Sequence, residues 1–353
     1  MINIISPINQ LGYGITGLNI CKSLSQITDV SLWPIGQPTV TNEEDARCIT
    51  ELISMSKMPV FEAPQIKIWH QHDMSSFAGH GLRIGFPIFE LDTFNDLEKH
   101  HLSSLDRIFV CSQWAKDVCL SNIDFDEDRI DVIPLGVDSD IFKYVEKEHT
   151  DKTIFYNCGK WEVRKGHDIL YKAFEEAFTE EDNVELWMMC DNPFYSESEQ
   201  SEWIGLYNRS NLSKKIKFIG RKETQQEVYN IMLQTDCGVF PSRGEGWNLE
   251  LLEMMSCGKQ VIATDYSAHT EFCNADNSLL VQIKNKELAY DGKWFHGKCG
   301  NWAEIGDEEI SSIALAMREV HKNKKKNQAG IETAHQYTWE NAARKILEVI
   351  NNV

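Results

Sequence analysis

The stretch Phe240-Pro-Ser-Arg-Gly-Glu-Gly-Trp-Asn-Leu-Glu-Leu-Leu-Glu-Met-Met-Ser-Cys-Gly258 decides how the second half of this chain folds. The apolar run 237–240 predicts a buried β-strand, and the Pro and Gly residues that follow predict a loop. A helical pattern begins at about Leu249 and ends at Gly258, a residue type that commonly follows a helix C-terminus. The stretch therefore reads as a strand, a glycine-containing loop and a helix N-terminus in direct succession.

This arrangement offers a site for an anion, because free backbone N–H groups and the positive end of the helix dipole favour negative charge there. Glu245 lies in the loop, and Glu253 lies about one turn into the helix, with seven residues between them. Carboxylates accept hydrogen bonds from hydroxyl groups and do not bind phosphate. A phosphate cradle flanked by two hydroxyl acceptors predicts a nucleotide sugar as the ligand.

The block Ser-x-x-Glu-Gly-x-x-Leu-x-x-Leu-Glu-x-x-x-x-Gly that contains Glu245 and Glu253 resembles the signature of retaining glycosyltransferases of the GT-B fold, glycosyltransferase family 4. The resemblance is strong over 153–272, fair over 104–142 and weak over 25–65. It implies a hexosyltransferase that moves a sugar from a nucleoside-diphosphate donor to a hydroxyl acceptor with retention. The family mechanism is a front-face substitution that needs no side-chain nucleophile.

Strand-like apolar runs alternate with helical patterns along the chain, which predicts an α/β protein with parallel sheets. The charged stretch 143–152 is interpreted as a linker. We therefore expect two Rossmann-like domains facing a central cleft, an acceptor-side domain over 1–148 and a nucleotide-sugar-binding domain over 149–337. The resemblance adds that the last helix, at about 338–353, packs back on the first domain.

The segment Gly159-Lys-Trp-Glu-Val-Arg-Lys-Gly166 follows a predicted strand and opens a helix. It is similar to the family motif Gly-Arg/Lys…Lys-Gly, which implies that Lys160 and Lys165 bind the donor diphosphate. Fixed cations there stabilise the negative charge that builds on the diphosphate as the glycosidic bond breaks, which gives Lys165 a catalytic role. The alternative is a solvated Arg-Lys pair, but the helix dipole disfavours cations at this end unless an anion is near.

The resemblance also implies the roles of the residues around Glu245. It assigns Glu253 to the donor ribose and Glu245, as a catalytic-site residue, to the donor sugar. Asn248 stands where the family commonly has glycine, so its side chain is expected to touch the donor. The backbone N–H groups expected near the diphosphate are those of Gly246, Trp247, Asn248 and Leu249.

An N-terminal glycine pattern, Gly12-x-Gly14-x-x-Gly17, matches the dinucleotide fingerprint as a loop between the predicted strand 3–6 and a helix expected over about 18–24. An NAD site would need an acidic residue that closes a second strand. Asp29 is available, but only the short run 30–33 is strand-like and it follows Asp29. The resemblance implies instead that Gly14 lets the backbone approach the donor diphosphate and the acceptor.

On the acceptor side, Trp69-His-Gln-His-Asp73 ends a predicted strand, and Glu90 follows another. We expect His72 and Glu90 to contact sugar hydroxyl groups in the catalytic site. Glu90 stands where many family members carry histidine, and His72 could instead be a buried structural residue. The two imidazoles have no third His or Cys nearby, so no metal is expected. The Asp-x-Asp strings 124–126 and 138–140 are not interpreted as metal sites, and Asp138 or Ser139 is expected to cap a helix.

Composition narrows the classes of partner. The chain has 353 residues and a formal net charge of -19, and residues 1–150 carry twice as many acidic as basic side chains. This charge argues against nucleic acid and anionic membranes as docking surfaces. The sequence has no apolar run long enough to span a membrane and no signal-peptide pattern. Its ten scattered cysteines are typical of a reduced compartment, so we expect a cytoplasmic protein. We expect no bound cofactor and no bound metal.

Three alternatives stay open from the sequence. An NAD-dependent dehydrogenase on two Rossmann domains would use the first glycine pattern but leaves Lys165, Glu245 and Glu253 unexplained. A nucleotide-sugar epimerase or hydrolase could share the GT-B scaffold. A non-catalytic sugar-nucleotide binder is the third.

Overall fold

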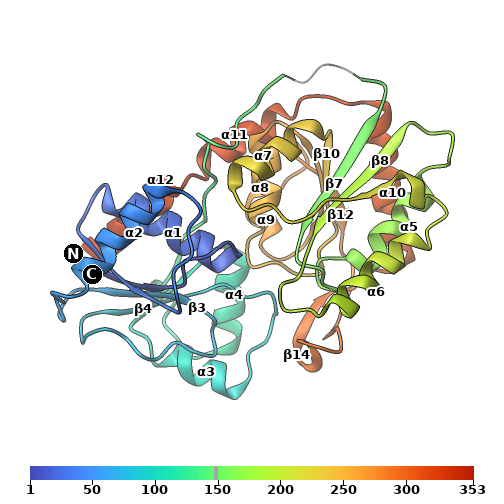
Figure 1. Ribbon diagram of the computed structural model, residues 1–353. Helices are drawn as coiled ribbons and strands as arrows, with labels where there is room; N and C mark the ends of the chain where they lie inside the picture. The colour runs from blue at the N-terminus through green and yellow to red at the C-terminus, as the bar shows by residue number, and fades with distance from the viewer. Residues whose placement is uncertain (147–149) are drawn as a thin grey trace. The chain divides into compact units, whose positions relative to one another are not determined.

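The computed structural model describes residues 1–146 and 150–353, and Figure 1 shows its ribbon. The chain divides into two compact units, one formed by Met1–Gly136 with Tyr337–Val353 and the other by Val137–Gln336. The domain boundary expected at 148 falls on residues 147–149, which lie outside the described residues.

The first unit is built on six parallel strands in the order β2-β1-β3-β4-β5-β6. The strands are β1 (Ile2–Ser6), β2 (Val30–Pro34), β3 (Gln65–Trp69), β4 (Arg83–Pro87), β5 (Arg107–Val110) and β6 (Ile130–Val132). The helices of this unit are α1 (Gly12–Ser25), α2 (Glu43–Met55), α3 (Asp96–Ser103), α4 (Gln113–Asn122) and α12 (Trp339–Asn351). The strand order reverses between β1 and β3, and ligands of such sheets bind outside the carboxyl ends of the strands at that point.

Helix α12 completes the first unit although it comes from the end of the chain. It packs on α1 (Figure 1), and Thr338 caps its first turn by accepting a hydrogen bond from the N–H of Asn341 at 3.2 Å. A Cβ atom on Gly136 would lie 2.2 Å from the backbone nitrogen of Trp339. Glycine is therefore needed where the chain leaving β6 meets the start of α12.

The second unit has its own sheet of six parallel strands, in the order β12-β11-β10-β7-β8-β9. The strands are β7 (Thr153–Gly159), β8 (Val184–Cys190), β9 (Ile216–Phe218), β10 (Cys237–Phe240), β11 (Gln260–Asp265) and β12 (Leu279–Gln282). The helices are α5 (His167–Ala177), α6 (Glu197–Asn208), α7 (Gln225–Gln234), α8 (Leu249–Ser256), α9 (His269–Phe272), α10 (Asp307–Lys322) and α11 (Gln328–Gln336). An antiparallel hairpin, β13 (Lys286–Tyr290) and β14 (His296–Ala303), follows the last strand of the sheet.

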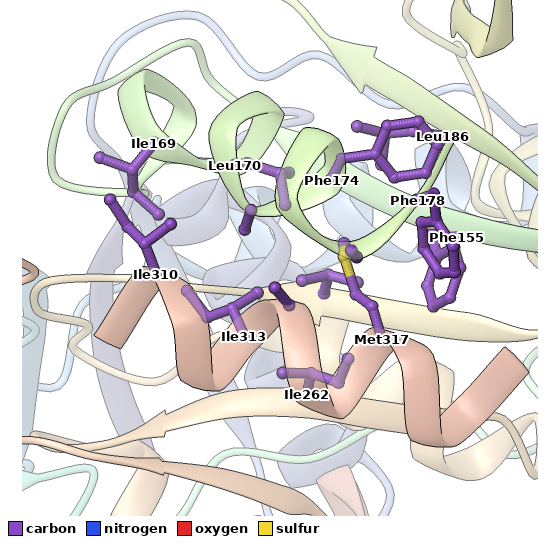
Figure 2. Packing of buried hydrophobic residues seen from close by; sticks show 14 of the residues in the cluster. Phe155, Ile169, Leu170, Phe174, Phe178, Leu186, Ile262, Ile310, Ile313 and Met317 are labelled. Atoms are coloured by element: carbon purple, nitrogen blue, oxygen red, sulfur yellow. The ribbon is translucent and has the colours of Figure 1, made fainter. Parts of the chain in front are cut away.

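The core of the second unit fixes helix α5. Figure 2 shows Phe174 of α5 and Met317 of α10 within one buried cluster, together with Ile262 of the sheet. The apolar positions of α5 recur at the helical period, which turns one face of the helix to α10 and the sheet. Burial of each such side chain stabilises the fold by about 1.5–3 kcal/mol. The loop that enters α5 is therefore attached to a firmly packed helix.

One expectation about the first unit was wrong. Helix α1 begins at Gly12, so the glycine pattern lies in the first turns of a helix, whereas a loop with a helix from about residue 18 was expected. The strand-like run after Asp29 is β2, paired with β1, and it follows Asp29 as expected. The expectations of alternating strands and helices in both halves, and of an α/β fold with two Rossmann-like domains, are confirmed.

Within residues 1–146 and 150–353, no helix is both long enough and apolar enough to cross a membrane.

Candidate functional site

Two loops of the second unit lie against each other at the carboxyl ends of adjacent strands. One joins β7 to α5, and the other joins β10 to α8. Gly166 ends the first loop with a φ of 74°, and a Cβ atom on it would lie 2.1 Å from the carbonyl oxygen of Pro241. Arg243 N–H donates to the carbonyl oxygen of Arg164 at 2.6 Å, which joins the two loops through their backbones. Predicted cations and carboxylates from separate parts of the sequence are thereby brought together.

A ladder of ion pairs, buried except at Lys160, links the two loops. Lys160 Nζ lies 2.8 Å from Glu162 Oε1, and Glu162 Oε2 accepts from Arg164 Nη2 at 2.7 Å. Arg164 Nη1 then donates to Glu245 Oε2 at 2.8 Å. Lys165 Nζ lies 3.0 Å from the other oxygen of Glu245, Oε1. The ladder alternates in sign and contains three cations and two carboxylates.

The ladder keeps its members charged inside the protein. Burial penalises the Glu245 carboxylate, but Lys165 and Arg164 outweigh it and hold the pKa of Glu245 well below its usual range. Burial likewise opposes the charge on Lys165, yet Glu245 and Glu250 raise its pKa above the usual lysine value. The exposed fractions of Lys165 and Glu245 are only 8% and 5%. Removing the Glu245 charge would leave Lys165 buried without its side-chain partner, which is strongly destabilising, whereas removing the Lys165 charge would leave Glu245 paired with Arg164.

His167 fixes the start of α5 beneath this ladder. Its Nδ1 accepts from the backbone N–H of Glu162 at 3.0 Å, and its Nε2 lies 2.8 Å from Asn157 Oδ1. Since Nδ1 accepts, the hydrogen-bond pattern places the ring proton on Nε2. Burial, aided by the charge of Lys165, lowers the pKa of His167 to about 3, so the ring is neutral at ordinary pH.

Glu253 differs from the ladder carboxylates. Its exposed fraction is 7%, and its carboxyl group makes no hydrogen bond or ion pair with any side chain in the described part of the chain. Burial, together with the charges of Glu250 and Asp138, raises the pKa of Glu253 well above its usual range. A buried carboxyl group with unfilled acceptor positions lowers the stability of the fold, and it can accept hydrogen bonds from a polar ligand.

The N-terminus of α8 presents backbone donors near Glu253. Asn248 adopts a φ of 88° and accepts from the N–H of Leu251 at 3.2 Å, which caps the helix. Among the described residues, no acceptor is found for the backbone N–H groups of Gly246, Asn248 and Leu249. These groups and the positive end of the helix dipole form a place for an anion.

Two side chains of this loop are turned into the protein. Asn248 Nδ2 lies 2.9 Å from His269 Nε2, so both ends of the Asn248 amide are used inside the fold. Trp247 is buried and packs on Phe272, with ring centroids 4.8 Å apart. The structure thus leaves the backbone, and not these side chains, available to a ligand. This differs from the expectation that the side chain of Asn248 touches the donor.

The first unit holds the other predicted residues, at the carboxyl ends of its strands. His70 and His72 follow β3, and their rings stack with centroids 5.2 Å apart. The Tyr13 hydroxyl lies 3.5 Å from His70 Nδ1. Burial and the nearby charge of Glu90 raise the pKa of Tyr13. His72 is exposed and Glu90 is half-buried, so both side chains are accessible in this unit.

Gly14 is explained by packing within the first unit. A Cβ atom on Gly14 would lie 2.3 Å from Asn9 Oδ1 and 2.4 Å from the Asn9 backbone nitrogen. The loop after β1 therefore rests directly on the first turn of α1. This contact alone accounts for glycine at the position.

In the described part of the chain, no group of three or more His, Cys, Asp or Glu side chains is arranged to hold a metal ion. Asp138 instead accepts from the N–H groups of Asp140 and Ile141, at 3.0 and 3.2 Å, within a local turn.

Several residues of the site were missed or left without a role by the sequence. Glu162 and Arg164 occupy the middle of the ladder, and Ser242 Oγ donates to Glu245 Oε1 at 2.8 Å. The sequence feature that indicated the ladder is the pair of cations at the start of α5, because cations at a helix N-terminus are disfavoured unless an anion lies nearby. The anions found there include the protein's own Glu162 and Glu245.

Comparisons with known proteins find similarity over both units of the chain. Residues 152–291 match the family model "Glycosyl transferases group 1". A GPI3 subunit of phosphatidylinositol N-acetylglucosaminyltransferase from Saccharomyces cerevisiae is 23% identical over 70% of this chain and 62% of its own length. A D-inositol 3-phosphate glycosyltransferase from Mycolicibacterium smegmatis is 22% identical over 71% of this chain and 54% of its own length. The chain thus spans less than two thirds of these curated relatives.

Solved structures match over the whole chain. HepE from Anabaena, in complex with UDP-glucose, superposes with a TM-score of 0.72 at 14% identity and covers 100% of this chain and 99% of its own. Sucrose-phosphate synthase from Thermosynechococcus elongatus gives a TM-score of 0.69 at 15% identity, with 99% and 98% covered. These likenesses, at low identity, concern the fold. The chain has the GT-B fold, and its residues 152–291 match the model of the Glycosyl transferases group 1 family.

Proposed function

We propose that this chain is a retaining glycosyltransferase of hexosyltransferase type, which transfers a sugar from a nucleoside-diphosphate sugar to a hydroxyl group. The observation that carries the proposal is Glu253, a buried carboxyl group whose acceptor positions no described side chain fills. A ribose diol supplies two hydroxyl donors to such a group. A dehydrogenase that uses the first glycine pattern would give Glu253 no role. The match of residues 152–291 to the family model supports the same assignment.

The diphosphate is assigned to the cationic end of the site. Lys165, at the end of the ladder, and Lys160, which is half-exposed beside Glu162, supply positive charge. The free N–H groups of Gly246, Asn248 and Leu249 supply oriented donors at the start of α8. Preorganised donors and charges stabilise the leaving diphosphate most when its negative charge is greatest, in the transition state. This assignment needs no metal ion and no bound cofactor.

The acceptor is assigned to the first unit. His72 and Glu90 are proposed as contacts for sugar hydroxyl groups because both side chains are accessible at the carboxyl ends of the strands, where ligands of such sheets bind. The acceptor hydroxyl is proposed to attack on the face from which the diphosphate leaves, so that no protein nucleophile is required. The departing phosphate oxygen is proposed to take the acceptor proton, so that no protein base is required. A cytoplasmic location is proposed from the ten scattered cysteines of the sequence.

The test is a transfer assay with a defined donor. UDP-glucose comes first, because HepE was solved with it, and D-inositol 3-phosphate is the first acceptor, because it names the M. smegmatis relative. The remaining donors carry GDP, ADP and dTDP, and the remaining acceptors are mono- and oligosaccharides. Nucleotide release is measured with and without acceptor, and the new linkage is read by NMR.

The proposal expects release that depends on an acceptor and a product with the donor's anomeric configuration. Inverted configuration would contradict retention. Donor consumption at the full rate without acceptor would indicate a hydrolase or an epimerase. A protein that binds donor and never releases nucleotide would be a non-catalytic binder.

A further inference from the structure

The antiparallel hairpin β13–β14 is anchored to the loop that leads into α8. Arg243 of that loop donates from Nε to Glu287 Oε1 at 2.9 Å, and Trp302 Nε1 donates to the same oxygen at 3.1 Å. The backbone N–H of Ala303 donates to the carbonyl oxygen of Arg243 at 2.8 Å. The base of the hairpin is therefore fixed to the part of the second unit that contains the candidate donor site.

The tip of the hairpin is tied to the segment between β8 and α6. Lys293 Nζ donates to the carbonyl oxygen of Phe194 at 3.3 Å and forms an ion pair with Glu199 in the first turn of α6. Asp291 Oδ1 accepts from the backbone N–H groups of residues 293–295, which shapes the tip. Figure 1 shows the hairpin, labelled β14, near α6. Because base and tip are both held, the side chains at the tip keep a fixed place beside this segment.

Two exposed aromatic rings meet where the hairpin tip contacts the segment between β8 and α6. The rings of Phe194 and Trp294 have centroids 6.1 Å apart at an interplanar angle of 78°, and the exposed fractions of the two residues are 54% and 48%. Lys160, one of the cations proposed for the diphosphate, has its Nζ 5.7 Å from the centroid of the Phe194 ring. The Phe194–Trp294 pair therefore borders the proposed diphosphate site.

The surroundings of the Phe194–Trp294 pair suit a neutral carbohydrate. Exposed apolar surface that is rimmed by polar groups marks an interaction site, and the C–H face of a pyranose can cover an aromatic ring. Lys293 and Glu199 lie at the rim, so both a hydrogen-bond donor and an acceptor are available to sugar hydroxyl groups. Because these two residues carry opposite charges, the rim selects neither an anionic nor a cationic ligand.

A nucleobase is the main alternative ligand for these rings. Bases stack face to face on aromatic side chains, and the angle of 78° between Phe194 and Trp294 leaves no parallel slot for a base between them. A pyranose needs only one ring face for its C–H groups and directs its hydroxyl groups sideways, toward the polar rim. The edge-to-face arrangement therefore favours a sugar ring over a base.

Strand β13 adds further exposed apolar surface to the hairpin. Successive side chains of a strand point to opposite faces. Glu287 is bonded within the second unit and Ala289 is buried, whereas the alternate residues Leu288 and Tyr290 are exposed. The hairpin thus exposes a second aromatic ring besides Trp294, which provides surface for a chain of sugars and not only for a single one.

We propose that the Phe194–Trp294 pair is a carbohydrate-binding site, and that it holds sugar rings of an oligosaccharide acceptor beside the donor site. The acceptor role rests on the proposed function, because it takes the chain to be a glycosyltransferase. The binding of carbohydrate by the pair does not depend on that function. The proposal names the class of acceptor as a neutral oligosaccharide whose chain contacts the second unit.

The experiment is calorimetric titration of the unchanged protein, Trp294→Ala and Phe194→Ala. The probes are hexasaccharides of glucose, N-acetylglucosamine, mannose and galactose, together with UDP, GDP, ADP and dTDP. We expect at least one hexasaccharide to bind the unchanged protein, and each variant to bind it about 10-fold more weakly, the scale of one lost aromatic contact. Both variants should bind the preferred nucleoside diphosphate like the unchanged protein.

Two further variants serve as controls. Trp294→Phe keeps an aromatic ring and should keep most of the affinity for the hexasaccharide, which guards against a folding defect. Leu315→Ala shortens an exposed apolar side chain on α10, in the same unit, and should leave every affinity unchanged. A loss of hexasaccharide affinity in Leu315→Ala equal to that in Trp294→Ala would show that the effect is not specific to the pair, and the proposal would fail.

The possible outcomes separate this proposal from the proposed function. If no hexasaccharide binds a protein that does bind a nucleoside diphosphate, the proposal is overturned and the proposed function stands. Alanine variants that lose the diphosphate and keep the hexasaccharide would overturn the proposal and assign the pair to the nucleobase. A hexasaccharide that binds through the pair, in a protein that binds no nucleoside diphosphate, would support the carbohydrate site and contradict the proposed function. Self-association that both alanine variants abolish in sedimentation, without hexasaccharide binding, would overturn the proposal and assign the rings to a contact between copies of the chain.

Discussion

The ammonium group of Lys165 lies 3.0 Å from Oε1 of Glu245, and the two side chains form an ion pair inside the second unit. Their positions are eighty residues apart in the sequence, and each comes from a loop that leaves the carboxyl end of a strand. Since the sheet places β7 beside β10, parallel pairing alone brings the two loops together. The pair links the loop before α5, which carries the cations, to the loop that leads into the N-terminus of α8.

Replacing Lys165 with alanine should lower turnover by at least about 100-fold, the scale of losing one preorganised donor in a catalytic site. The reason is that the diphosphate loses a fixed charge while its own negative charge is increasing. Initial rates at saturating donor measure the effect. Lys217→Ala, which removes a half-exposed cation paired with Glu185, is the control and should leave turnover unchanged. Near-normal turnover in Lys165→Ala would remove this residue from the mechanism.

Glu253→Gln should make the protein more stable and bind nucleotide more weakly. The pKa of Glu253 is raised in the folded state, so its contribution to stability is present below the ordinary glutamate pKa of about 4.3 and is lost as the pH rises through the raised value. The amide has no such loss and should raise the stability at neutral pH by about 0.5–2 kcal/mol. Thermal melts between about pH 4 and pH 9 measure the difference. If the two proteins follow the same pH profile, Glu253 is not the buried acid described above.

His167 should make the fold sensitive to acid. Its pKa is lowered to about 3, whereas the unfolded chain ionises near pH 6.5, so its stabilising contribution is present above about pH 6.5 and is lost as the pH falls toward 3. His167→Gln should lower the free energy of unfolding by about 1–3 kcal/mol at neutral pH, because Asn157 and the Glu162 N–H lose their partner. The difference in the free energy of unfolding between the variant and the unchanged protein, the stability gap, should become smaller as the pH is lowered. The exposed His296→Gln serves as control, and a gap that stays constant with pH would rule out titration of His167.

Gly14→Ala should destabilise the first unit by about 1–3 kcal/mol through overpacking against Asn9. Urea denaturation followed by circular dichroism measures this change. Gly12→Ala is the matched control, because a Cβ atom on Gly12 would have no heavy atom within 4 Å. A Gly14 variant of normal stability that fails only in donor binding would show that the glycine serves the ligand instead.

The sequence predicted the architecture well because strand and helix periods are local. The runs around β1, β3, β7 and β10 were all recognised from apolar patterns. The start of α1 was misplaced, since glycine is a poor helix former and the pattern Gly12-x-Gly14-x-x-Gly17 is read as a loop. In the fold, Gly14 is needed there by a contact with Asn9 that no local pattern reports.

The candidate site was predicted as a set of residues but not as a set of contacts. Glu245, Glu253 and Lys165 were named from the motif, whereas the position of Arg164 between two carboxylates depends on which loops meet. Asn248 is a second example. Its side chain caps α8 and lies against His269, so it is engaged within the protein, whereas the sequence assigned it to the ligand. Which side chains remain available to a ligand depends on hydrogen bonds between loops that are distant in the sequence.

The most direct test of the donor site is a thermal-shift panel of UDP, GDP, ADP and dTDP on the unchanged protein, Lys165→Ala and Glu253→Ala. A ligand that binds only the folded state stabilises it by about 2.7 kcal/mol at one hundred times its dissociation constant. The account predicts a shift with one diphosphate that is lost in both variants. No shift with any diphosphate, accompanied by a shift with NAD, would contradict it and assign the two Rossmann-like units to a dehydrogenase.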